Sequence, residues 1–485
     1  MFGRKTTALL APAIVRAGSF LLVAALLLAS CGGRASPTAA PTSKPVATQP
    51  PPPTTAPPTT APPTKVIKVT MTNAPDENDK LAVERQKQLE EAFKTRRPDV
   101  VIEAHQGGWN KEAFAAKFAG GTMEDAFLVP ITEPQDLIAK GYAADITDLI
   151  KAWEHFASFN PTVLKIVQDA KGRIYGIPVS GFAQGLIYNR KLFKEAGLDP
   201  DKPPTTWDQV REYARKLTDP AKGRAGFVEC SKSNQGGWHL VAWIYSYGGD
   251  VEVQKDGKWV AAFNNEAALK SLQMLKAMRW EDKSLTEQML DVAGVLPLLA
   301  TERVAMSIMA PDALRSLKTQ YQANIEDFGF GPLPQGGGNA TYAGGNFWMF
   351  NSKSSPEVLK AAVEWTLFHS SDLATYDADL KAQRDRGQLV GYPDLPVYTG
   401  EFARQRAAIV AKHANAPVQY YKPYLEALEG RLQLRAAPPV EAQKLFALLD
   451  TVLQAILTDT KADPKKLLDE AAQQFQTQVL DPLNK

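Results

Sequence analysis

The amino-acid sequence predicts an α/β protein with largely parallel sheets, preceded by a segment that directs export. Three observations lead to this prediction. Strand-like and helical patterns alternate from residue 65 onward, residues 34–64 are rich in proline, and the first 30 residues join basic residues to an apolar run. Alternation of strands and helices is typical of α/β layers, in which a ligand binds beyond the carboxyl ends of the strands.

The alternation of predicted strands and helices begins in the first part of the chain after residue 65. Residues 66–71 alternate and are rich in β-branched side chains, which predicts a strand. A helical spacing of apolar residues follows over 79–95. Strands are then expected at 99–104 and 125–129, with a short helix at 114–118 between them.

The second half continues the pattern. A strand is expected at 185–189 and a helix at 191–196, which Gly197 ends. Thr206 is expected to cap a helix that starts at Trp207. Further strands are predicted at 304–309 and 328–330, and the chain is mostly helical from about residue 356.

Length and charge exclude some classes of protein. The chain has 485 residues, enough for two or three domains, and 44% of them are hydrophobic. Removal of the N-terminal segment, which holds Arg4, Lys5 and Arg16, changes the formal net charge from +2 to −1. A nearly neutral chain cannot neutralise many phosphates, so no nucleic-acid partner is expected.

The N-terminal sequence indicates a lipoprotein signal peptide over residues 1–30. The apolar run at 20–29 is too short to span a bilayer. It ends in Leu28-Ala29-Ser30-Cys31-Gly32, which resembles a bacterial lipobox, and lipidation is expected at Cys31. The alternative is an ordinary signal peptide with an incidental cysteine.

Residues 31–64 are expected to form a tether. Residues 34–64 contain 11 prolines and no aromatic residue, a composition that favours extended polyproline II over a packed core. The remaining cysteine, Cys230, then has no partner for a disulfide. It is expected to be a buried, inert thiol, with a nucleophile as the less favoured alternative.

Several motifs, in a consistent order, carry a resemblance to a known family. The most distinctive is Tyr188-Asn189-Arg190-Lys191-Leu192-Phe193-Lys194-Glu195-Ala196-Gly197-Leu198 followed by Pro203-Pro204-Thr205-Thr206-Trp207. Ile174-Tyr175-Gly176-Ile177-Pro178 precedes it, and Ala343-Gly344-Gly345-Asn346 comes later. Over about residues 66–480 the chain resembles the bacterial extracellular solute-binding protein family 1, which includes maltose-binding proteins of ABC importers.

The resemblance implies a two-lobed periplasmic-binding-protein-like fold with a ligand cleft between the lobes. Lobe one would comprise 65–180 plus 346–410, and lobe two 185–343 plus 415–485. It also implies a monomeric, membrane-anchored, extracytoplasmic protein that binds a sugar and delivers it to the permease of an ABC importer. No cofactor, metal or catalytic residue is expected.

Sugar recognition uses aromatic rings for the apolar C–H faces and paired hydrogen-bond donors and acceptors for the hydroxyls. The family resemblance points to Trp238, at the start of a helix, as a stacking residue. The other candidate ligand-binding residues are Asn73, Asp76, Phe182, Asp312, Asn346, Phe347, Trp348, Tyr421 and Tyr424. Several of these have a structural alternative: core packing for the aromatic residues, helix capping for Asp312 and a turn for Asp76.

The ligand class stays open at this stage. The loop Pro130-Ile131-Thr132-Glu133 departs from the maltose-binding pattern, which argues against maltodextrin. The adjacent Tyr420-Tyr421 allows a metal ion as ligand, and a polyamine or other charged solute is a further alternative. A lipoprotein glycoside hydrolase would need two carboxylates in the cleft, and the sequence marks no such pair.

The expected anchor leads to a direct test. Replacement of Cys31 by Ser removes the thiol that would carry the lipid, so the protein should leave the membrane fraction for the soluble one. Fractionation with metabolic lipid labelling measures this. Continued labelling of the Cys31→Ser protein would rule the anchor out.

Overall fold

The computed structural model describes residues 65–77, 80–430 and 432–484. Residues 63–485 form one compact unit, and this unit is described by itself. The expected signal peptide, Cys31 and the tether lie outside the described residues. In the described part, no helix is both long and apolar enough to cross a membrane.

Two sheets organise the unit, and both have mixed strand directions. The larger has six strands, in the order β12-β11-β3-β1-β2 with β4 also paired to β11. Its strands are β1 Ile67–Met71, β2 Val100–Ala104, β3 Ala126–Pro130, β4 Gly176–Ala183, β11 Ala340–Phe350 and β12 Gln433–Arg435. β1 is parallel to β2 and β3, whereas β11 runs antiparallel to β3 and β4.

The smaller sheet has the order β10-β5-β9-β6. Its strands are β5 Gly185–Asn189, β6 Ala225–Val228, β9 Val304–Met309 and β10 Phe328–Pro332. β5 is antiparallel to both of its neighbours, and only β6 and β9 are parallel. The α/β class is therefore confirmed, but the expectation of largely parallel sheets is corrected. β4 leads into β5 through the single residue Gln184, so no crossover helix separates these strands.

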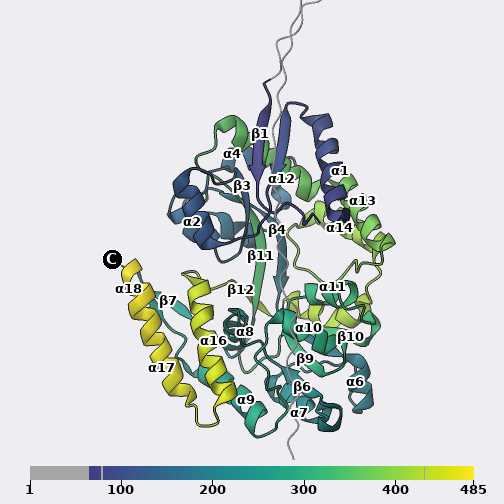
Figure 1. The fold of residues 1–485 in the computed structure, drawn as a ribbon, viewed down its shortest axis with the longest axis vertical. Helices are drawn as coiled ribbons and strands as arrows, with labels where there is room; N and C mark the ends of the chain where they lie inside the picture. Colours follow the sequence, from purple (N-terminus) through teal and green to yellow (C-terminus); the bar gives the residue numbers. More distant parts are fainter. Residues whose placement is uncertain (1–64, 78–79, 431, 485) are drawn as a thin grey trace, which may run out of the picture. The chain divides into compact units, whose positions relative to one another are not determined.

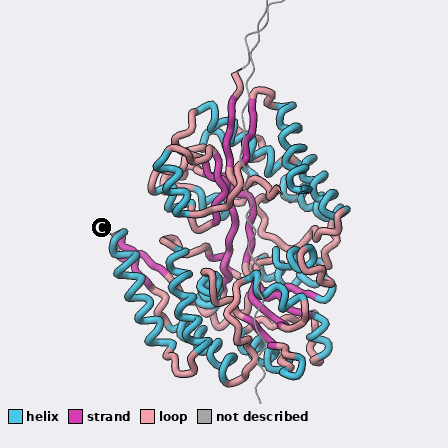
Figure 2. Tube along the Cα trace, viewed as in Figure 1, coloured by secondary structure: helices cyan, strands magenta, loops and turns pink. Residues whose placement is uncertain are grey.

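Helices cover both sheets (Figures 1 and 2). Those between the strands of the first half are α1 Lys80–Arg96, α2 Lys111–Gly120, α3 Pro134–Ala139, α4 Thr147–Lys151 and α5 Pro161–Leu164. The middle of the chain supplies α6 Arg190–Glu195, α7 Trp207–Leu217, α8 Gln235–Ser246, α9 Glu266–Trp280, α10 Val292–Ala300 and α11 Asp312–Thr319. The rest is mainly helical, as expected: α12 Pro356–Ser371, α13 Leu373–Asp385, α14 Gly400–His413, α15 Lys422–Leu428, α16 Ala442–Thr458, α17 Pro464–Phe475 and α18 Asp481–Leu483. A hairpin, β7 Glu252–Lys255 with β8 Lys258–Ala261, lies between α8 and α9.

Local sequence explains where the helices near the family motif begin. Asn189 ends β5 and its side chain accepts the N–H of Leu192 at 3.0 Å, which caps α6. Gly197 follows this helix with φ 71°, a left-handed conformation that suits glycine. Thr206 caps α7 in a reciprocal capping box with Gln209, which confirms the predicted helix start.

Separate hydrophobic clusters support the two sheets. The larger sheet packs on the helices around it through residues such as Val69, Phe127 and Trp365. A second cluster joins α7, α8, α9 and α16, and at its centre the rings of Trp207 and Trp243 stack at 3.3 Å. Cys230 is fully buried, as predicted, and burial raises the pKa of its thiol well above its ordinary value.

A buried carboxyl group in the hairpin makes stability depend on pH. Glu252 of β7 accepts the N–H of Val440 at 3.0 Å, and burial raises its pKa from about 4.5 to about 8. Between these values the unfolded chain has released the proton that the folded chain still holds. The stability that the protonated Glu252 side chain contributes is therefore complete below about pH 4.5 and is lost as the pH rises toward 8.

Glu252→Gln tests this assignment. The neutral amide can still accept the Val440 N–H but cannot ionise, so the variant should not share this loss. The free energy of unfolding in urea, measured at several pH values from 4.5 to 8, should fall more steeply in the unmodified protein, by at most about 1.4 kcal/mol per pH unit. Parallel pH profiles for the two proteins would contradict the assignment.

Candidate functional site

A cavity of about 280 Å³ lies between the larger sheet and the starts of α8 and α16. The end of β3, the paired strands β4 and β11, the start of α8 and the start of α16 all border it. Its lining residues are Pro130, Ile131, Thr132, Phe182, Ser233, Asn234, Gln235, Trp238, Tyr342, Gly345, Asn346, Gln443 and Phe446. Residues from positions 130 to 446 thus converge on one site.

Aromatic rings form one wall of the cavity. Trp238 is half-buried, and its ring meets that of Phe182 edge to face, with centroids 6.0 Å apart at 84°. It meets Tyr342 in the same way, at 6.0 Å and 89°. Gly344 makes room for this arrangement, because a Cβ atom there would lie 2.2 Å from the Phe182 ring. The rings are thus held at fixed angles and present an apolar surface to the cavity.

The polar side chains that line the cavity are uncharged. Asn346 donates a hydrogen bond to the Ser180 hydroxyl at 3.3 Å, and Asn234 donates to the Gln443 side chain at 3.2 Å. The Thr132 hydroxyl donates to Glu133 at 2.9 Å. Amides and hydroxyls have more than one donor or acceptor position, so these side chains keep capacity for a ligand. None of the lining residues carries a charged side chain.

Asp450 of α16 fixes the start of α8 and so positions Trp238. Its carboxylate accepts the backbone N–H of Asn234 and that of Gly237, each at 2.7 Å. Gly237 packs directly on α16, where a Cβ atom would lie 2.1 Å from the Phe446 carbonyl oxygen. Burial raises the pKa of Asp450, although the backbone hydrogen bonds favour its charged form. α8 and α16 therefore hold this corner of the cavity as one piece.

A buried acid supports α8 one layer further from the cavity. Glu229 accepts a hydrogen bond from the indole N–H of Trp243 at 2.6 Å, and its other oxygen lies 2.6 Å from His239 Nδ1. All three residues are buried. His239 follows Trp238 in the sequence, so this contact fixes the helix turn that carries the cavity-facing indole. The amino-acid pattern offers little sign of it, because Glu229 stands between apolar neighbours just after β6.

Of the candidate residues named from the sequence, the structure brings Trp238, Phe182 and Asn346 together in the cavity. Phe347 and Trp348 are 1% and 4% exposed and pack in the core of the larger sheet. The sheet is covered on both faces, so successive residues of β11 are buried after Asn346.

The other candidates also lie outside the cavity lining. Tyr421 and Tyr424 are fully buried against the smaller sheet, and the Tyr424 hydroxyl donates to the Ala183 carbonyl at 2.8 Å. Asn73 and Asp76 are exposed after β1. Asp312 is the first residue of α11 and Pro311 is at the N-cap position, so the alternative of helix capping by Asp312 is not seen either. These placements give no support to ligand contact by these five residues.

Sequence reasoning missed much of the lining. Ser233, Asn234 and Gln235 lie three to five positions before Trp238, so their proximity could have been inferred from the predicted loop-to-helix junction. Gln443 and Phe446 come from α16, about 200 positions later, and nothing local distinguishes them from other residues of an amphipathic helix. Only the packing of α16 on α8 reveals their role.

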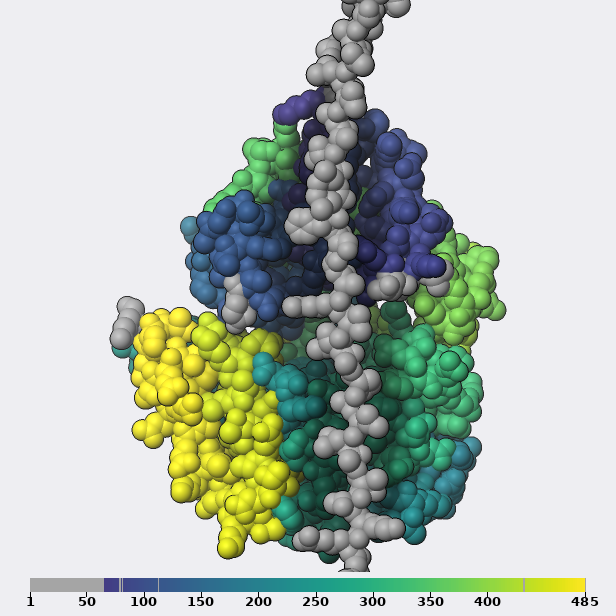
Figure 3. Space-filling model, viewed as in Figure 1, coloured from purple at the N-terminus to yellow at the C-terminus, as the bar shows by residue number. Residues whose placement is uncertain are grey.

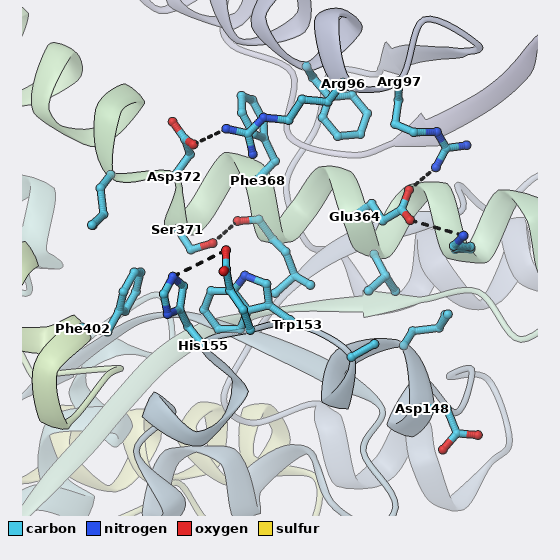
Figure 4. A pocket seen from close by; sticks show the side chains of 18 residues that line it. Arg96, Arg97, Asp148, Trp153, His155, Glu364, Phe368, Ser371, Asp372 and Phe402 are labelled. Carbon is cyan, nitrogen blue, oxygen red and sulfur yellow. Dashed lines mark hydrogen bonds and ion pairs between the residues drawn. The ribbon is translucent and has the colours of Figure 1, made fainter.

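A larger cavity, of about 610 Å³, lies among α1, α4, α12 and α14 (Figure 4). Its floor is apolar, with Trp153, Phe368 and Phe402 among the lining residues. Charged groups at its edge pair with each other: Arg96 with Asp372 at 2.6 Å, and Arg97 with Glu364. None of the candidate residues lines this cavity, which makes the smaller one the better ligand site.

Proteins of known structure share this fold. A solute-binding protein from Thermotoga lettingae with bound α-D-tagatose has a TM-score of 0.65 and 20% identity, covering 84% of this chain and 98% of its own. Maltose-bound MalE3 of T. maritima has a TM-score of 0.64 and 22% identity, covering 85% of this chain and all of its own. The predicted periplasmic-binding-protein-like fold is therefore confirmed.

Sequence relatives have more varied descriptions. A probable amino-acid ABC transporter periplasmic-binding protein of Sinorhizobium fredii is 27% identical over 46% of this chain and 52% of its own length. The sn-glycerol-3-phosphate-binding periplasmic protein of Pectobacterium atrosepticum is 24% identical over 65% of this chain and 68% of its own. The chain thus spans about half to two thirds of the curated relatives that it matches.

The family itself is clear. The profile of the bacterial extracellular solute-binding proteins matches residues 74–370, more than half of the chain. These are binding proteins and not enzymes, in line with the prediction from sequence. The chain belongs to the bacterial extracellular solute-binding protein family.

Proposed function

We propose that the chain is the binding component of an ABC importer and that its ligand is a small, uncharged sugar or polyol. The lining of the cavity carries this proposal. Rings suit the C–H faces of a sugar, and neutral amides and hydroxyls suit its hydroxyl groups. We further propose the lobes inferred above, with the cavity in the cleft between them, and a Cys31 lipid with a proline-rich tether on the outer side of the membrane.

The absence of charge from the lining argues against other ligands. A phosphate, an amino-acid zwitterion or a polyamine would lose hydration in the cavity and would need an opposite charge there. The described lining residues supply none. For the same reason, the cavity has no pair of carboxylates for glycoside hydrolysis.

The size of the cavity favours a short ligand. Its 280 Å³ is at the lower end of typical ligand sites, which hold about 300–1,000 Å³. We therefore expect one or two sugar rings, or an open-chain polyol, in preference to a long oligosaccharide. Solved relatives with tagatose, mannitol and ribitol bound are consistent with this size.

A thermal-shift panel tests the ligand class. It should contain tagatose, maltose, mannitol, ribitol, sn-glycerol 3-phosphate, an amino-acid mixture and spermidine. A ligand present at 100 times its Kd should stabilise the protein by about 2.7 kcal/mol, so a true ligand will raise the Tm clearly. Stabilisation by only the charged solutes would overturn the proposal.

Trp238→Ala tests the stacking role within the cavity. Loss of a central aromatic contact commonly costs about 2 kcal/mol or more, so affinity for the panel ligand should fall at least about thirtyfold. Calorimetric titration measures the affinity, and a ligand-free melt measures the stability. Trp259→Ala is the matched control, because Trp259 is a half-buried tryptophan of β8 that packs on the same core but lies outside the cavity. Equal affinities for the two variants would contradict the stacking role.

A further inference from the structure

An ion-pair cluster lies beside the candidate ligand site and joins two of its walls. At its centre is Lys111, the first residue of α2, whose Nζ lies 3.1 Å from Glu441, 3.5 Å from Asp136 and 3.9 Å from Glu133. Glu441 immediately precedes α16, whereas Glu133 and Asp136 belong to the loop and helix that follow β3. One ammonium group thus bridges carboxylates of two separate segments, and its partner Glu441 lies 330 positions from it in the chain.

Each anchor of the cluster is attached to a residue that lines the cavity. Glu133 accepts the hydroxyl hydrogen of Thr132 at 2.9 Å, and Thr132 lines the cavity. Glu441 stands two residues before Gln443, which lines the cavity from the other side. Lys111 itself is not among the lining residues. It can therefore act on the ligand only by holding these two walls together.

The surroundings of Lys111 favour its charged form, and the two other lysines of the cluster do not bridge the walls as it does. Burial opposes its charge, but the neighbouring carboxylates outweigh burial and raise its pKa. Lys140 and Lys444 also contact the cluster, but each pairs with a carboxylate of its own wall, Asp136 and Glu441 respectively. Glu133 is 2% exposed, and its Oε2 atom has no hydrogen-bond partner among the described residues. Burial raises the pKa of Glu133, and Lys111 is the neighbouring cation that favours its charged form.

We propose that Lys111 is a positioning residue that holds the cleft closed by bridging the β3–α3 wall and the α16 wall. The proposal rests on the proposed function only in taking the cavity as the ligand site. Closure is an equilibrium, and an interaction made only in the closed form shifts that equilibrium by its own free energy. Figure 3 shows the contact region, where the yellow C-terminal helices adjoin the blue early part of the chain.

The distance between the two walls, measured without ligand, tests the proposal. Spin labels on Ala119→Cys of α2 and Ala447→Cys of α16 report it in the full chain carrying Cys31→Ser, since both alanines are exposed and the remaining native thiol, Cys230, is fully buried. Double electron–electron resonance should show a short-distance population in the otherwise unmodified chain. Lys111→Gln should reduce that population about three- to tenfold, as should Glu441→Gln, and high salt should weaken it by screening.

Controls separate bridging from a general loss of charge. Lys444→Gln removes a cation that also contacts Glu441 but belongs to the same wall, in the first turn of α16, and it should leave the distances unchanged. The double variant Lys111→Gln with Glu441→Gln should be no more open than either single variant, because both remove the same contact. A short-distance population that is absent from the unmodified chain, or unchanged by Lys111→Gln, would overturn the proposal. Because no ligand is present, a failed sugar panel would not affect this result.

Discussion

The antiparallel pairing of β4 and β11 is the constraint on which the rest of the structure depends. Both strands belong to the larger sheet, yet β4 passes directly into β5 of the smaller one. Where the chain crosses, Gln184 donates its backbone N–H to the Tyr342 carbonyl at 2.8 Å, and the Thr341 hydroxyl donates to the Gln184 carbonyl at 2.7 Å. Both backbone polar groups of Gln184 are thus paired at the crossing, and Phe182, Tyr342 and Asn346 of these two strands line the cavity.

Around these two strands, charged side chains are excluded from the cavity lining and lie directly behind it. Asp450 and Glu229 satisfy backbone and ring N–H groups of α8, where unpaired donors would be costly. Lys111 and its carboxylates lie just outside the lining. The ligand would therefore contact only aromatic rings and neutral polar groups. The charged side chains behind this lining determine the positions of the rings and the neutral groups.

The sequence predicted those parts of the fold and site that depend on local patterns. Thr206, Gly197 and the strand at 185–189 follow from capping, backbone conformation and alternation, all of which act within a few residues. Trp238 and Asn346 could be predicted as site residues because glycines precede each of them and mark a close approach of the backbone. Phe347, Trp348, Tyr421 and Tyr424 show the limit of this reasoning. An aromatic residue beside a glycine or proline can face a cavity or a core, and only the burial of the whole strand or helix decides which.

The position of α16 in the chain has a consequence for biosynthesis. Gln443 and Phe446 form part of the cavity wall, and Asp450 holds the start of α8, although that helix was completed about 200 residues earlier. A chain emerging from an export channel with its N-terminus first would present the aromatic wall long before the wall that faces it. Capture of ligand would then have to wait for the last few dozen residues, so a partly exported chain would carry no cargo.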